Sequence, residues 1–277
     1  MKNHKIVEFT SGEPGLVVGF LKFLAQEQNW DWQFETITDF SLDALHGATA
    51  AYVDTRLSKE ILPKLKMHST ETRSSLCIDS FFKEESTWYP RLLISEALRL
   101  MLVQEARDLN NRAPAFVVGT GELARVAANV LAEVGVSEIY LVGESAEGEE
   151  LRHELMRALL GIKFHSVLPE DLTVQAVSAG IIINTVDLAD NEELMRDLTY
   201  FNFMRNDGYV LDFNLLPLQN PLLLEATKAE LKTLTPQALY ARVVKQWLDR
   251  LEVGSYLTLE DLCESWMQFL KENSSSV

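Results

Sequence analysis

The sequence predicts a two-lobed α/β protein. Strand-like segments alternate with segments of helical periodicity along the chain, which is typical of sheets whose strands are joined by helical crossovers. The 277 residues are long for one domain and suit two. A turn-rich stretch, residues 110–114, interrupts the alternation. We therefore expect a first α/β lobe from residues 1–107 with 237–277, and a Rossmann-like parallel-sheet lobe from residues 108–236.

The first hundred residues predict four strands and two helices. Leu16, Phe20, Phe23 and Leu24 share one face at helical spacing, so they predict a helix near the start of the chain. The predicted helices are Gly15–Gln28 and Leu92–Leu109. The predicted strands are Lys5–Phe9, Gln33–Ile37, Ala50–Asp54 and Leu76–Phe82.

In the second lobe the sequence predicts five strands. The nearly continuous apolar character of the last two suits a parallel sheet covered on both faces. The five strands are Ala115–Val118, Glu138–Val142, Lys163–Val167, Gly180–Asn184 and Tyr209–Phe213. Arg125–Val134 and Glu149–Leu160 have the periodicity of connecting helices. After Pro236, Gln237–Leu251 and Thr258–Lys271 predict two more helices, which we assign to the first lobe.

Composition and charge exclude several classes of function. Lys and Arg total 25 and Asp and Glu 41, giving a formal net charge of −16 without a basic run, so we expect neither a nucleic-acid partner nor an anionic membrane surface. The two cysteines, Cys77 and Cys263, are far apart, which favours a reducing, cytoplasmic location. No two histidines have the i, i+4 spacing of a helical metal site, so we expect no metal.

The strongest motif is a glycine-rich turn between a predicted strand and a predicted helix. It reads Gly119, Thr120, Gly121, Glu122, Leu123 and Ala124. Such a turn lets a diphosphate approach backbone amides at the helix N-terminus. Glu144 follows the next strand, where a carboxylate bonds a ribose 2′-hydroxyl and repels a 2′-phosphate. If a dinucleotide binds, we expect NAD rather than NADP; the alternative is a Rossmann-type fold that has lost its nucleotide site.

Residues 208–226 resemble the shikimate dehydrogenase family, whose pattern there is Asp-x-x-Tyr-x-Pro-x-x-Thr-Pro-Leu-Leu. The matching residues are Asp212, Pro217, Pro221, Leu222 and Leu223, whereas Leu215 replaces the tyrosine and Asn220 the threonine. The strand residues 181–184 and the order of the lobes also resemble this family. The resemblance implies a substrate lobe, a Rossmann lobe and a nicotinamide cofactor.

The same resemblance implies which residues would line the substrate-type pocket. The family holds the substrate carboxylate with two serines; here Ser11 fits the first position, and Glu13 brings a carboxylate to the second. Thr55 and Lys59 fit the family's Asn-Val-Thr-x-Pro-x-Lys pattern, and Lys59 is the candidate catalytic residue.

Two further substitutions affect the family's chemistry. Leu92 takes the place of the aspartate that moves a proton together with the lysine, and Leu215 removes a polar contact to the substrate. Loss of one acid–base group lowers the rate by a factor of about 10²–10⁴. We therefore expect no meaningful oxidation of shikimate.

Three functions remain open from the sequence. The first is a catalytically degenerate relative that binds a nucleotide, a metabolite or a protein partner. The second is an NAD-dependent oxidoreductase with a different small-molecule substrate. A Glu13 carboxylate in the pocket would favour a neutral or cationic substrate. The third is a divergent shikimate or quinate dehydrogenase.

Overall fold

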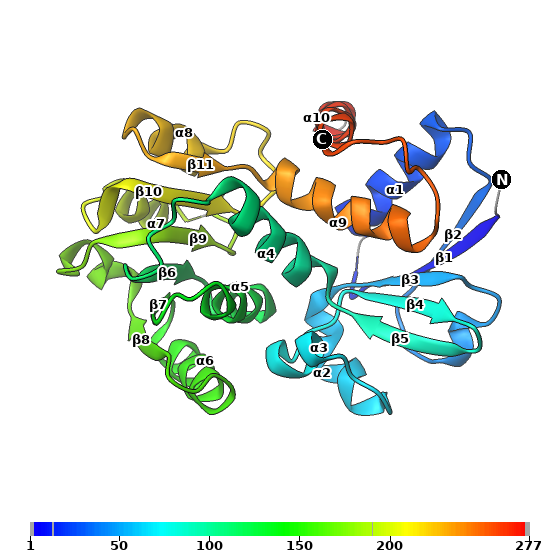
Figure 1. Cartoon of the computed structure of the whole chain (residues 1–277), viewed down its shortest axis with the longest axis horizontal. Coiled ribbons are helices and arrows are strands. Elements are labelled where there is room, and N and C mark those ends of the chain that lie inside the picture. The colour runs from blue at the N-terminus through cyan, green and yellow to red at the C-terminus, as the bar shows by residue number, and fades with distance from the viewer. Residues whose placement is uncertain (1–2, 13, 190, 275–277) are drawn as a thin grey trace. The chain divides into compact units, whose positions relative to one another are not determined.

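The computed structural model describes residues 3–12, 14–189 and 191–274, and it confirms the predicted α/β class. The chain divides into two compact units (Figure 1). The first unit comprises residues 1–96 and 240–277, and the second comprises residues 97–239. Helices α4 (Leu93–Glu105) and α9 (Pro236–Arg250) each contribute residues to both units.

The first unit contains a five-stranded mixed sheet in the order β2-β1-β3-β4-β5. Strand β1 pairs in parallel with β2 and β3, whereas β4 is antiparallel to both β3 and β5. The strands are β1 (His4–Phe9), β2 (Trp32–Ile37), β3 (Ala50–Val53), β4 (Ser80–Glu84) and β5 (Thr87–Arg91). The helices are α1 (Leu16–Glu27), α2 (Ser58–Ile61), α3 (Thr70–Ser75) and α10 (Leu259–Ser274).

Aromatic side chains pack the helices of this unit together. Phe20 of α1 stacks on Trp266 of α10 with ring centroids 3.9 Å apart, and both side chains are fully buried. A separate buried cluster contains Phe9, Val53 and Phe81 from three neighbouring strands. Burying several aromatic rings supplies much of the stability of such a small core. The carboxyl ends of β1 and β3 are thereby fixed side by side.

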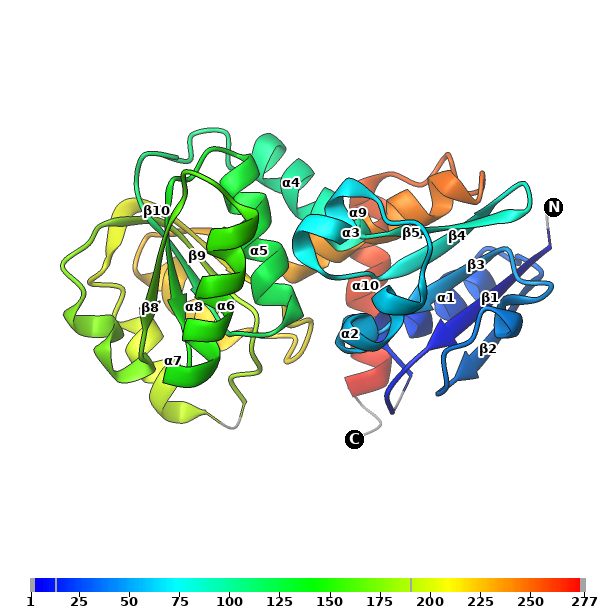
Figure 2. The same ribbon diagram turned by 90° about the horizontal axis from the view of Figure 1, so that it is seen from below.

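The second unit contains a six-stranded, fully parallel sheet in the order β11-β10-β9-β6-β7-β8. Its strands are β6 (Ala115–Val118), β7 (Glu138–Val142), β8 (Lys163–Val167), β9 (Ala179–Asn184), β10 (Met204–Asp212) and β11 (Lys232–Leu234). Its helices are α5 (Glu122–Glu133), α6 (Ser145–Ala158), α7 (Glu192–Thr199) and α8 (Pro221–Lys228). Figure 2 shows α5 beside α6, and the two helices pack together.

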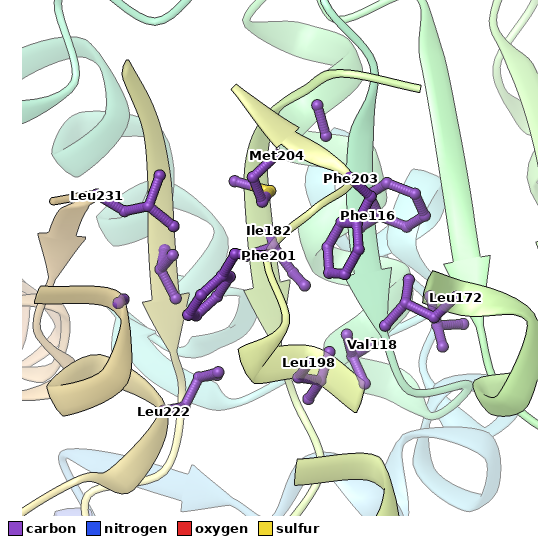
Figure 3. Close-up of a cluster of buried hydrophobic side chains, with 14 of the residues drawn as sticks. Phe116, Val118, Leu172, Ile182, Leu198, Phe201, Phe203, Met204, Leu222 and Leu231 are labelled. Atoms are coloured by element: carbon purple, nitrogen blue, oxygen red, sulfur yellow. The ribbon is translucent and has the colours of Figure 1, made fainter. Parts of the chain in front are cut away.

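A buried hydrophobic cluster joins the strands of this unit to α7 and α8 (Figure 3). Phe116 of β6 and Ile182 of β9 contribute to it, together with Leu198 of α7 and Leu222 of α8. Phe203, which precedes β10, packs edge-on against Phe116 with ring centroids 5.1 Å apart. These strands bury side chains on both faces, as the apolar runs of the sequence predict.

Some segments differ from the sequence-based expectation. The predicted strand Leu76–Phe82 begins only at Ser80, because Leu76 has φ +47° and ends α3. Strand β5 was not predicted; it contains Pro90, and proline is tolerated there because β5 lies at the edge of the sheet. Helices α7 and α8, eight residues each, and the three-residue β11 were also missed. In the described part of the chain, no helix has the length and hydrophobicity needed to cross a bilayer.

Candidate functional site

The glycine-rich turn lies where the strand order of the second unit changes direction. Strand β6 is flanked by β7 on one side and β9 on the other, and ligands of such sheets bind at the carboxyl ends of the strands beside this switch point. Gly119 has φ +114°, and a Cβ atom there would lie 2.4 Å from Thr185 Oγ1. Thr185 is itself fixed because its hydroxyl donates to the carbonyl of Val118 at 2.7 Å. Only glycine fits this turn.

Gly121 differs from Gly119 because the space where a side chain would lie is open. Gly121 is the N-cap of α5, and no atom lies within 4 Å of the position of an added Cβ. Ala124 is fully buried, while Glu122 and Leu123 are half-buried in the first turn. An exposed glycine at the start of a twelve-residue helix can bring backbone amides to a diphosphate. The turn therefore fits the phosphate group of a dinucleotide in shape.

The charges around this turn are negative. Glu144 is exposed and is the N-cap of α6, directly after β7. Thr120 donates a hydrogen bond from Oγ1 to Oε2 of Glu147 at 2.7 Å, which brings a second carboxylate of α6 to the turn. Shape therefore favours a nucleotide, whereas charge disfavours any additional phosphate near Glu144 and Glu147.

In the first unit, the ends of β1 and β3 carry polar side chains. Ser11 Oγ donates to Asp54 Oδ2 at 3.1 Å, and Arg56 Nε donates to both carboxylate oxygens of Asp54 at 3.0 and 2.9 Å. Burial raises the pKa of Asp54, but the hydrogen bonds from Arg56 and Ser11 outweigh it and hold that pKa below its usual value. The carboxylate is therefore ionised at neutral pH.

The half-buried phenol of Tyr52 lies in the same unit as two buried carboxylates, those of Glu8 and Asp79. Glu8 is 1% exposed and accepts hydrogen bonds from the Gly15 amide at 2.6 Å and the Thr36 hydroxyl at 3.1 Å. Burial raises the pKa of the Tyr52 phenol well above its usual value, and the charges of Asp79, Asp54 and Glu8 add to the effect. This part of the molecule disfavours another anion.

The other candidate pocket residues are spread over different environments. Lys59 is exposed on α2, Thr55 is half-buried before that helix, and Leu92 is 3% exposed between β5 and α4. Glu13 lies outside the described residues. Within the described part of the first unit, the structure brings Ser11 to Asp54 and not to a second serine hydroxyl.

Leu215 lies in the second unit and is 5% exposed. The segment before it is held by a polar network around the buried Asp212, whose two oxygens accept from Asn214 at 2.7 Å and from Asn220 at 3.0 Å. Asn220 also caps α8 by accepting from the Leu223 amide at 3.1 Å. Asn220 thus has a structural role where the family pattern has threonine.

Among the described residues, no three His, Cys, Asp or Glu side chains are grouped so that they could hold a metal ion.

No protein-family model matches the sequence. A shikimate dehydrogenase (NADP(+)) from Mesorhizobium japonicum is 32% identical over 126 residues, which span 44% of this chain and 42% of that protein. A quinate dehydrogenase from Corynebacterium glutamicum in complex with NAD has a TM-score of 0.76 at 13% identity, with 96% of this chain and 98% of that chain covered.

A shikimate 5-dehydrogenase from Listeria monocytogenes in complex with shikimate and NAD has a TM-score of 0.75 at 14% identity, with 95% of each chain covered. The chain has the shikimate dehydrogenase fold. The sequence match to a shikimate dehydrogenase covers less than half of either protein, so the similarity over the whole chain is one of fold.

Within this family fold, sequence reasoning missed Asp79, Tyr52 and Glu147. Burial raises the pKa of Asp79 to about 6, and its carboxylate accepts from the first turn of α4, directly after Leu92. Asp79 lies 14 residues before Leu93, inside a predicted strand, so the local sequence carried no signal for this cap. The sequence likewise carried no signal for the contact of Glu147, because Thr120 is 27 residues away.

Proposed function

We propose that this protein is a shikimate dehydrogenase-like protein that binds a nucleotide and does not oxidise shikimate. The observation that carries the proposal is the hydrogen bond from Ser11 to Asp54. Where the family resemblance places a serine that holds the substrate carboxylate, this serine is bound to a carboxylate of the protein. A carboxylate substrate would meet like charge there, which is penalised at close quarters.

The environment of Leu92 supports the same proposal. A buried leucine can neither accept nor donate a proton, and the nearby Asp79 carboxylate is engaged by the amides of Leu93 and Ile94 at 2.9 and 2.7 Å. Lys59 is exposed on a short helix. The lysine–aspartate pair that moves the proton in the family therefore has no counterpart at position 92.

The glycine-rich turn supports nucleotide binding. The amides at the start of α5, exposed beside Gly121, would hold the diphosphate, and Glu144 would accept a hydrogen bond from a ribose hydroxyl. A bound nicotinamide cofactor would supply hydride transfer. We expect NAD to bind more tightly than NADP, because the Glu144 carboxylate would repel a 2′-phosphate.

The second candidate is an NAD-dependent oxidoreductase with a neutral or cationic substrate. The carboxylates of Glu8 and Asp54 beside Tyr52 favour such a substrate over an anionic one. Reduction of NAD in the presence of polyols or amino compounds, and not shikimate, would distinguish this candidate from a pure binder.

A thermal-shift measurement with NAD, NADH and NADP tests nucleotide binding. A ligand at 100 times its Kd adds about 2.7 kcal/mol to the free energy of unfolding, so binding raises Tm by several degrees. We expect stabilisation by NAD or NADH and less by NADP. The Gly121→Val variant is the control, because a side chain there blocks the amides. No shift with any dinucleotide up to millimolar concentration would overturn the nucleotide-binding part of the proposal.

A further inference from the structure

The hydrogen bond between Thr120 and Glu147 joins the glycine-rich turn to the first turn of α6. Thr120 is held in place by packing, because a Cβ atom on Gly143 would lie 2.4 Å from its Cγ2 atom. With the methyl group against Gly143, the hydroxyl is directed to α6 and donates to Glu147 Oε2 at 2.7 Å. The carboxylate of Glu147 is therefore fixed beside the turn.

The sequence around this carboxylate is poor in cations. Between Gly119 and Leu151 the sequence has seven glutamates and one basic residue, Arg125. The guanidinium of Arg125 is hydrogen-bonded to Glu154. Among the described residues, no ion pair with Glu147 is formed. The charge of Glu147 thus remains available to repel an approaching anion.

The position of Glu147 relative to Glu144 decides which anion it meets. Glu144 lies at the end of the second strand of the nucleotide fold, β7, where an acidic residue bonds the ribose 2′-hydroxyl. Glu147 is three residues further on, so both side chains lie on one face of the start of α6. Free amides at a helix start attract phosphate, and a fixed carboxylate in the first turn opposes this attraction.

We propose that Glu147 is a specificity-determining residue of the nucleotide site, and that its carboxylate, fixed by Thr120, excludes ligands with a phosphate on the 2′ oxygen of the adenosine ribose. The inference rests on the proposed nucleotide binding and adds a second residue to the discrimination expected from Glu144. A 2′-hydroxyl can donate to a neighbouring carboxylate, whereas a 2′-phosphate brings up to two negative charges to it.

Isothermal titration calorimetry with NAD⁺ and NADP⁺ tests the proposal on the full chain. For Glu147→Gln we expect NADP⁺ to bind about tenfold more tightly, as removal of one like-charge contact predicts, and the affinity for NAD⁺ to change by less than about threefold. The gain should shrink as salt is raised, because exposed charges are screened. Thr120→Val keeps the methyl group against Gly143 and releases the carboxylate, so we expect a smaller gain for NADP⁺.

Glu150→Gln is the matched control, since it removes the same charge one turn further along α6. We expect it to change neither affinity by more than about twofold, because charge effects fall off beyond the first turn of a helix. An equal gain for NADP⁺ in the Glu150 and Glu147 variants would show a general charge effect and would overturn the assignment to Glu147.

The outcomes separate this inference from the proposed function. If the native protein binds NAD⁺ and Glu147→Gln gains no affinity for NADP⁺, the inference is overturned and nucleotide binding stands. If the native protein binds neither dinucleotide but Glu147→Gln binds NADP⁺, the inference is supported and native nucleotide binding is overturned. Absence of binding in every variant overturns both.

Discussion

The carboxylate of Asp79 accepts a hydrogen bond from the backbone amide of Ile94 at 2.7 Å, in the first turn of α4. Leu93 donates to the same carboxylate at 2.9 Å, and the Ser80 hydroxyl donates at 2.8 Å. Burial raises the pKa of Asp79 to about 6, although these hydrogen bonds and the positive charge of Arg250 lower it. Helix α4 contains residues of both units. The titratable Asp79 of the first unit therefore caps a helix whose later residues belong to the second unit.

Ionisation of the Asp79 carboxyl should lower the free energy of unfolding as pH rises from about 4 to about 6. The pKa of Asp79 in the folded state lies above the unfolded value of 3.8, so the folded state binds the proton more tightly. The resulting contribution to the free energy of unfolding is largest below about pH 4. A shift of about two pH units corresponds to about 3 kcal/mol of unfolding free energy. Asp79→Asn should remove this part of the pH dependence in urea titrations from pH 4 to 7, whereas Asp39→Asn, at an exposed site, should not. An unchanged pH dependence in Asp79→Asn would contradict the assignment.

The two glycines of the nucleotide turn should respond differently to substitution. Gly119→Ala introduces a methyl group 2.4 Å from Thr185 Oγ1 at a positive φ, so it should lower the free energy of unfolding by about 1–3 kcal/mol. Gly121→Val meets no atom within 4 Å, so it should retain most of the stability and lose nucleotide binding. Chemical denaturation and calorimetry measure the two effects. Equal stability losses for both variants would contradict the geometry of the turn.

Asn220→Ala should destabilise the second unit more than loss of a helix cap alone. Asn220 both caps α8 and donates to the buried Asp212, so its removal loses a cap and leaves a buried carboxylate with fewer donors. We expect a loss of about 2–4 kcal/mol from the combined effects. Asn191→Ala is the control, because Asn191 caps α7 through Leu194 alone, and about 1 kcal/mol is expected. Equal losses in urea unfolding would show that the bond to Asp212 contributes nothing.

Introducing an aspartate at position 92 should destabilise the protein without producing shikimate oxidation. Leu92 is 3% exposed, so Leu92→Asp would bury a charge near Asp79 and remove apolar packing. The loss should equal or exceed the 2–5 kcal/mol typical of truncating a buried leucine, and it should grow from pH 5 to pH 8 as the new carboxyl ionises. Leu92→Asn lacks the charge and should show no such growth. A stable, active Leu92→Asp variant would indicate that position 92 faces a substrate site.

The regular parts of the fold could be predicted from sequence, since they depend on local periodicity. The strands around Val117 and Leu141 were predicted with their observed bounds because most residues in each are apolar and suit a sheet. The helix containing Arg125 begins three residues earlier than expected, at Glu122, because Gly121 serves as its cap. Short elements such as α8 were missed because eight residues give too little periodicity to detect.

The arrangement of the candidate site depends on contacts between distant residues. The glycine turn was predicted from local sequence, since its spacing is a local property. The bond from Ser11 to Asp54 joins residues 43 positions apart, and that from Thr120 to Glu147 joins residues 27 apart. Such pairs are set by strand register and by helix packing, neither of which is encoded in a single segment. The positions of the charged side chains within the candidate site could therefore be established only from the structure.

The nicotinamide absorbance of the purified protein with shikimate and either NAD⁺ or NADP⁺ is the most direct test of whether this protein oxidises shikimate. Ser11 is hydrogen-bonded to Asp54, and Leu92 is buried at the position to which the sequence resemblance assigns the family's aspartate, so we predict no reduction of either cofactor above the rate without protein. An authentic shikimate dehydrogenase under the same conditions is the positive control. Turnover of shikimate at an ordinary enzymatic rate, on the order of 1–10³ s⁻¹, would contradict the account.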